Sequence, residues 1–123
     1  MAEGIFFYGN SGFVGPGSIG ARLLENESGT YQGPWIPSHE FSRFSVMVSG
    51  LNSAAGPVTI YGANTDGAPT AMTDPGIVTL GTITLSTSAE SGIFSWEYPV
   101  RFISAGAVLT AGQVWAFLQG TTP

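Results

Sequence analysis

Apolar residues in this chain recur at every second position, and almost never at the 3.6-residue spacing that indicates a helix. In the segment 41–51, for example, Phe44, Val46 and Val48 fall on one side of an extended strand. The segment 113–119 has the same period. We therefore expect an all-β fold, an antiparallel β-sandwich that is jelly-roll-like with about eight strands.

Turn-forming residues indicate where the first strands end. Residues 50–53, Gly-Leu-Asn-Ser, follow the strand 41–51, and the next alternating segment is 58–63. We expect these two segments to be neighbouring antiparallel strands joined by that turn. A second tight turn is expected at residues 64–67, where Asp66-Gly67 would supply a positive φ.

Two irregularities are expected in the strands that follow. The expected inward residues of the segment 77–85 are Val78 and Leu80, then Ile83 and Leu85, so the inward phase slips by one residue at Gly81-Thr82, which predicts a β-bulge. Pro99 lies inside the segment 94–104, and because proline cannot donate a ladder hydrogen bond it predicts an edge position or a strand break.

The last expected strand, 113–119, is apolar on both faces. Its inward residues alternate with Trp115 and Phe117, whereas a strand solvated on one side alternates with polar residues. The second face is therefore expected to be covered by the protein's own domain, by a partner subunit or by the N-terminal segment.

The N-terminal third differs in composition from the rest. Residues 1–40 are dense in Gly and Pro and predict an arm with weak edge strands, whereas residues 41–123 predict the sandwich body of one structural domain. Residues 9–20 are rich in glycine, so they either form an extended arm that orders on docking or an ordinary surface loop between edge strands.

Ionisable residues are scarce. The chain has three Arg, one His, no Lys and no Cys, so we expect no enzyme, no catalytic or cofactor-binding residues, no metal site and no cofactor. A net charge of −5 argues against nucleic acid as a partner. The acidic Met1-Ala2-Glu3 start is unlike an export signal, and no apolar run approaches the ~20 residues of a membrane span.

Four other patterns suggest chemistry, and each has a simpler interpretation. Residues 15–20 match G-x-G-x-x-G but lack the flanking strand and helix of a dinucleotide site. His39-Glu40 lacks the rest of a catalytic triad. Asn64, Asp66 and Asp74 offer oxygen ligands for calcium, but turn formation is favoured. Trp35, Trp96 and Trp115 suggest a saccharide platform, for which core and interface packing is the favoured alternative.

Residues 43–120 resemble small all-β bacteriophage virion proteins, which include head decoration or cement proteins and neck or tail accessory modules. The resemblance rests on FSVMVSG at 44–50, VTIYGANTDG at 58–67, VTLGTI at 78–83, YPVRFISA at 98–105 and VWAFLQG at 114–120. It implies a sandwich, made in the host cytoplasm and carried in the virion, that binds and stabilises the lattice of major capsid protein. A homo-oligomer, dimer or trimer, would match the local symmetry of such a shell.

The expected function is therefore that of a capsid decoration protein, with contacts through the N-terminal arm and the last strand. A neck, tail or fibre accessory module and a carbohydrate-binding module are the alternatives, and a hydrolase comes last. The residues expected at the protein interface are Gly9, Gly12, Phe13, Gly15, Gly17, Ile19, Trp115 and Phe117.

Overall fold

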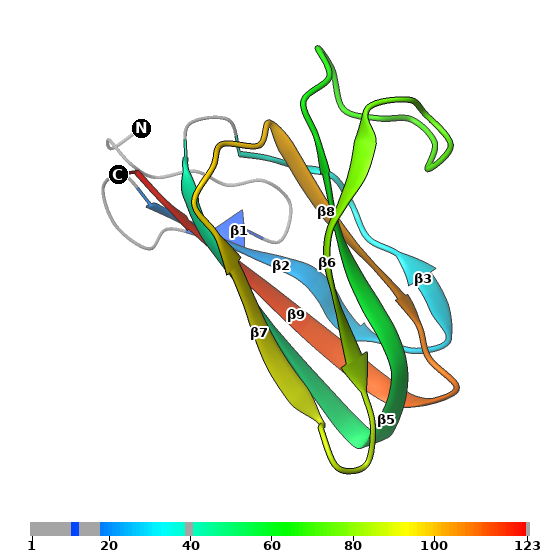
Figure 1. Cartoon of the computed structure of the whole chain (residues 1–123). Helices are drawn as coiled ribbons and strands as arrows, with labels where there is room; N and C mark the ends of the chain where they lie inside the picture. The colour runs from blue at the N-terminus through cyan, green and yellow to red at the C-terminus, as the bar shows by residue number, and fades with distance from the viewer. Residues whose placement is uncertain (1–10, 13–17, 39–40, 123) are drawn as a thin grey trace.

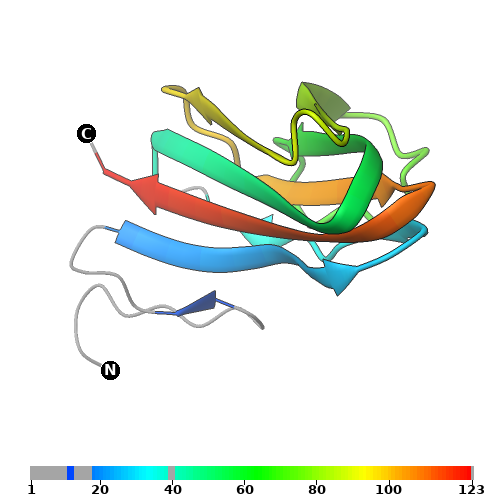
Figure 2. The same ribbon diagram turned by 90° about the horizontal axis from the view of Figure 1, so that it is seen from below.

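The computed structural model describes residues 11–12, 18–38 and 41–122, and within them every regular element is a β-strand. All strand pairs are antiparallel, and the strands form the two layers of a sandwich, which confirms the expected fold class (Figures 1 and 2). The strands are β1 (Ser11–Gly12), β2 (Ser18–Glu27), β3 (Thr30–Gln32), β4 (Ile36–Pro37), β5 (Arg43–Ala63), β6 (Ile77–Leu85), β7 (Ser91–Trp96), β8 (Phe102–Val108) and β9 (Ala111–Thr121).

The pairings define two sheets that share the long strand β5. Sheet A has the order β1-β2-β9-β5-β7 and uses the first half of β5. Sheet B has the order β6-β5-β8 and uses the second half, while β3 and β4 pair with different parts of β8. Figure 1 shows β5 descending in one sheet and returning in the other.

The hairpin expected between residues 41–51 and 58–63 is wrong, because both segments belong to β5. Asn52 and Ser53 adopt positive φ angles of 57° and 61°, and the register with β9 shifts between Leu51 and Ala55. The turn-forming residues therefore carry the chain from one sheet into the other, and the two halves of β5 pair with different strands and not with each other. Gly56 has a φ of 137° beside this bend, and a Cβ there would collide with the carbonyl oxygen of Val108.

The core lies between the sheets and contains the inward residues that the alternation predicts. On β5, Val46, Val48 and Ile60 are fully buried, and Phe44 stacks on Trp96 with ring centroids 4.9 Å apart. Other fully buried apolar side chains come from β2, β5, β6, β8 and β9: Ile19, Leu23, Leu24, Val58, Leu85, Ile103, Val114 and Leu118.

Both expected irregularities are present. The register between β5 and β6 pairs Ile60 with Gly81 and then Tyr61 with Thr79, so the bulge lies at Leu80, one residue before the expected position. Val78, one of the residues expected to face the core, is exposed and is not part of it. Pro99 lies between β7 and β8, where the strand is interrupted.

Strand β2, in the N-terminal third of the chain, is longer and more fully paired than expected. It is ten residues long, and it pairs with β1 on one side and with β9 on the other, so the expectation of weak edge strands is wrong for this segment. Apolar residues at 19, 21, 23 and 24 are buried in the core, which explains why this segment joins the sheet although the residues before it are rich in Gly.

The tight Asp-Gly turn expected at residues 64–67 is also wrong. Gly67 is not among the glycines with positive φ, and β5 is joined to β6 by a longer loop, residues 64–76. Within it, Gly76 adopts a φ of 93° directly before β6 begins.

Candidate functional site

A row of apolar side chains crosses the outer face of sheet A. Met47 of β5 lies opposite Phe117 of β9 on one side and Ile93 of β7 on the other. The exposed fractions are 53% for Met47, 65% for Ile93 and 41% for Phe117. Cross-strand neighbours on one face have Cβ atoms ~5 Å apart, so these side chains form one continuous patch.

Trp115 extends this patch along β9. Its ring stacks on that of Phe117, with centroids 5.9 Å apart and an angle of 8° between the planes. Trp115 is half-buried, and Ser49 lies opposite it on β5. We call Met47, Ile93, Trp115 and Phe117 the apolar face of sheet A.

Two adjoining hollows mark the surface of this sheet. One, of about 310 Å³, is lined mainly by apolar atoms and includes Met47, Ile93 and Phe117. The other, of about 320 Å³, shares Ser45 and Gln119 with the first and is more polar; its remaining lining residues are Arg43, Phe44, Ser95, Trp96, Glu97 and Thr121. An apolar centre with a polar border is the composition of a protein–protein interface.

The charges beside the apolar face compensate one another. Arg22 lies opposite Phe117 in the register and its Nη1 is 2.7 Å from Glu25 Oε1. At the polar hollow, Arg43 Nε is 3.8 Å from Glu97 Oε1. Exposed pairs of this kind contribute ~0–1 kcal/mol to stability, so their main effect here is to keep this region near neutral in a chain of net charge −5.

The outer face of sheet B has different side chains. Thr59 lies opposite Thr82 on β6, and Tyr61 lies opposite Ser104 on β8. Gln32 donates through Nε2 to Ser104 Oγ at 2.8 Å, and Ser104 Oγ donates to the Gly33 carbonyl at 2.9 Å. These side chains are polar and hydrogen-bonded to one another, and the large apolar residue exposed on the same side of β8 is Val108, at the end of the strand.

The structure brings together some of the residues expected at the interface and separates others. Trp115 and Phe117 are adjacent on the outer face of sheet A. The assignment of Ile19 to the interface is wrong, because its side chain points inward and is fully buried in the core. Gly12 pairs with Gly20 between β1 and β2. The other expected residues, Gly9, Phe13, Gly15 and Gly17, lie outside the described residues.

Sequence reasoning missed Met47 and Ile93 as site residues. The alternation in residues 41–51 already placed Met47 on the outward side, and the signal overlooked was a large apolar residue where a polar one is usual. Ile93 occupies the equivalent outward position on β7, which only the strand pairing brings next to Met47.

No described residues form a cluster of three or more His, Cys, Asp or Glu that could hold a metal ion. Asp74 Oδ2 instead accepts hydrogen bonds from the backbone N–H groups of Thr70 at 2.8 Å and Ala71 at 3.2 Å. These backbone hydrogen bonds lower the pKa of Asp74 below its usual value. The Asp74 carboxylate therefore stabilises a turn of its own loop, which is the interpretation that the sequence favoured over a calcium site.

The remaining candidate patterns do not form a common site. Trp96 is buried between Phe44 and Phe94, whereas Trp115 lies on the outer face, so these two indoles cannot share a saccharide platform. His39-Glu40 lies outside the described residues. The G-x-G-x-x-G pattern ends within β2, a strand, where a dinucleotide site would need a helix. Across the described ranges there is no helix with the length and hydropathy to traverse a bilayer.

Comparison with known proteins finds similarity of fold but not of sequence. The sequence matches no protein-family profile and no curated protein. Among solved structures, the SPBc2 prophage-derived protein YomS aligns with a TM-score of 0.55 and 15% identity over 85% of this chain and 93% of that one. The K1 cleaved adhesin domain of Lys-gingipain from Porphyromonas gingivalis W83 aligns with a TM-score of 0.47 and 8% identity over 86% of this chain and 74% of that one. At these identities the likeness concerns the β-sandwich.

Proposed function

We propose that this chain is a structural protein of a bacteriophage virion, a capsid decoration protein that binds the lattice of major capsid protein through the apolar face of sheet A. The observation that carries the proposal is the continuous exposed row Ile93–Met47–Phe117, extended by Trp115. Large exposed apolar patches with polar borders mark protein-binding surfaces, and aromatic residues dominate the energetics of such interfaces.

Two further observations support this assignment. The fold resembles that of a prophage-derived protein across nearly the whole length of both chains. The region around the apolar face has compensated charge, so docking does not bring the net negative charge of the chain directly against its partner. The role needs no cofactor and no catalytic group, and the chain acts as a binding protein, not as an enzyme.

Affinity in such a role would come from repetition. Each copy buries a modest surface, and a dimer or trimer engages several lattice subunits at once, which raises the effective concentration of every further contact. The partner is the major capsid protein or another virion protein.

The test is the protein composition of purified virions, measured by quantitative mass spectrometry. A decoration protein is expected in a copy number comparable to that of the major capsid protein. A few copies per particle would support a neck, tail or fibre module instead, and complete absence from particles would refute the virion assignment.

A further inference from the structure

Two adjoining hollows lie at the end of sheet B, where the loop 64–76 leaves β5 and the chain enters β8. Their volumes are about 140 Å³ and about 240 Å³, and both are lined by Asn64, Pro99 and Val100. Arg101 borders the larger hollow, and the smaller one is also lined by Gly62, Ala63, Gly76, Val78, Leu80 and Tyr98. None of these residues belongs to the apolar face of sheet A.

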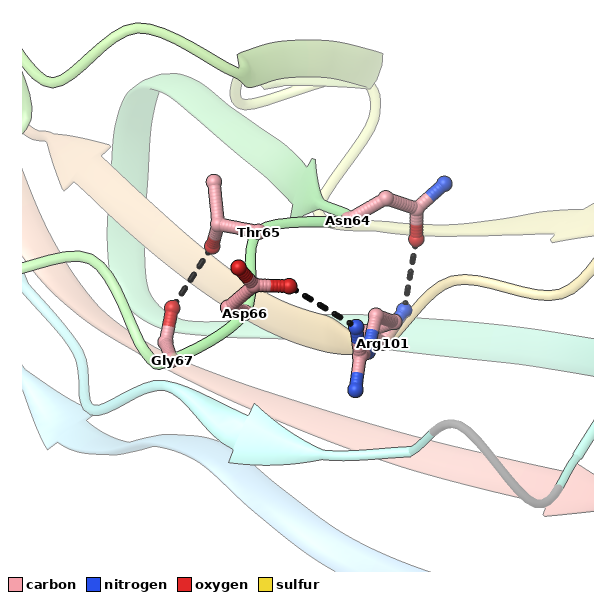
Figure 3. A network of polar contacts seen from close by, with 5 residues as sticks. All are labelled: Asn64, Thr65, Asp66, Gly67 and Arg101. Carbon is pink, nitrogen blue, oxygen red and sulfur yellow. Dashed lines mark hydrogen bonds and ion pairs between the residues drawn. The ribbon is translucent and has the colours of Figure 1, made fainter.

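Polar side chains at and beside the larger hollow present both donors and acceptors: Asn64 and Arg101 line it, and Asp66 lies next to Arg101 outside the lining. Asn64 Oδ1 accepts a hydrogen bond from the Arg101 N–H at 2.8 Å, which turns its Nδ2 away from the protein backbone (Figure 3). The guanidinium of Arg101 lies 3.7 Å from Asp66 Oδ1, and both side chains are exposed. The amide and the guanidinium therefore offer N–H groups, and the carboxylate offers an acceptor, within one small area.

The backbone under these groups is fixed by hydrogen bonds, one of them buried. Ser38 is 1% exposed; its Oγ donates to the Val100 carbonyl at 2.6 Å, and its N–H donates to the Arg101 carbonyl at 2.7 Å. Thr65 Oγ1 donates to the Gly67 carbonyl at 2.6 Å, an exposed hydrogen bond at the bend that carries Asp66 (Figure 3). A site held in place before binding loses less entropy when a ligand arrives.

An aromatic ring and an aliphatic side chain border the smaller hollow. Tyr98 is 50% exposed, and Val78 is also exposed. A pyranose ring combines an apolar face of C–H groups with hydroxyls that both donate and accept hydrogen bonds, so it matches an exposed aromatic ring beside an amide and a carboxylate. The pairing of Arg101 with Asp66 leaves no net charge, which favours a neutral sugar over an anionic one.

We infer that the site formed by Asn64, Asp66, Tyr98 and Arg101 binds a neutral sugar. The C–H face of the pyranose ring packs on Tyr98, and its hydroxyls form hydrogen bonds with Asn64 Nδ2, the Asp66 carboxylate and the Arg101 guanidinium. This activity goes beyond the proposed docking role, because a copy attached through the apolar face of sheet A keeps these four residues available. A virion coat built in this way would carry glycan-binding sites at many positions.

The test begins with the full chain on an array of neutral hexose and N-acetylhexosamine oligosaccharides together with sialylated ones. The best neutral oligosaccharide is then titrated by calorimetry. Tyr98→Ala should weaken binding by about tenfold or more, through loss of the stacking surface. Asn64→Asp should have a similar effect, because it keeps the acceptor for the Arg101 N–H but removes the Nδ2 donor.

Controls separate this inference from the proposed docking function. Phe117→Ser should leave sugar binding unchanged, and Tyr98→Ala should leave binding to virions unchanged. If Tyr98→Ala does not fold, the same calorimetric titration is made with Asn64→Asp and Arg101→Gln. The inference is overturned if the chain binds no neutral oligosaccharide, if it binds only sialylated ones, or if folded Asn64→Asp and Arg101→Gln bind with the affinity of the parent.

Discussion

On the outer face of sheet B, polar side chains form hydrogen bonds with one another, whereas on the outer face of sheet A large apolar side chains lie uncovered. Gln32 and Ser104 illustrate the first case, and Met47 and Phe117 the second. A solvated antiparallel sheet alternates apolar residues inside with polar residues outside, and sheet B follows that rule more closely than sheet A, with Val108 as an exposed apolar residue at the end of β8. Covering apolar surface contributes roughly 25 cal/mol per Å², so the face that breaks the rule is the one that gains from a partner.

The largest expected effect is the difference in unfolding free energy between a substitution on the inner side of sheet A and one on its outer side. Ile19→Ala removes a fully buried side chain and should lower the free energy of unfolding by about 2–5 kcal/mol. Ile93→Ala removes an exposed one and should change it by less than about 0.5 kcal/mol. Urea denaturation measures both, and equal losses would contradict the division between core and docking face.

The next effect concerns docking. Phe117→Asp places a charge at the centre of the apolar face and should weaken binding to virions by about 2 kcal/mol or more, with little change in stability. Thr82→Asp is the matched variant on the outer face of sheet B and should bind like the parent chain. Co-sedimentation with particles stripped of this protein measures both, and equal loss in the two variants would place docking elsewhere.

A smaller effect tests the polar face. Ser104→Ala removes the acceptor for Gln32 and the donor to Gly33, and should cost about 1–3 kcal/mol of stability because these groups are buried or half-buried. Ser95→Ala, at an exposed position on β7, is the control and should be nearly neutral. Thermal unfolding distinguishes them, and virion binding should be retained in both.

The smallest expected effect is on the pH dependence of stability, and it comes from Asp74 in the loop 64–76 between β5 and β6. Since the pKa of Asp74 is lowered in the folded state, its contribution to stability is fully present above the unfolded pKa, about 4, and is lost as pH falls through the folded pKa. Asp74→Asn should therefore reduce the decline of Tm between neutral and strongly acidic pH. Asp66→Asn, with no backbone hydrogen bond to its carboxylate among the described contacts, is the control, and an equal change there would contradict this role for Asp74.

The alternation of apolar residues predicted the fold class and most of the inward residues, because a half-buried strand repeats with period two. It could not predict strand pairing. Asn52 and Ser53 have the same preference for positive φ in a reversing turn and in a bend within one strand, and only packing against β9 decides between them.

The sequence predicted two of the four residues of the apolar face of sheet A. Trp115 and Phe117 were recognised because one strand carried apolar residues on both faces. Met47 and Ile93 join them through pairing between β9, β5 and β7, which are far apart in the sequence. Ile19 was misassigned because the glycines around it suggested an arm, whereas burial in the core decided its position.

The continuity of β5 through both sheets also affects how the protein responds to load. This 21-residue strand pairs with β6, β7, β8 and β9. A force applied at the outer face of sheet A is therefore transmitted to sheet B through the backbone of β5. Since each layer contains half of the same strand, separating the layers also has to break the pairing of β5 with β9 at the bend, between Ala55 and Ala111. Single-molecule extension should therefore show one rupture event for the whole sandwich.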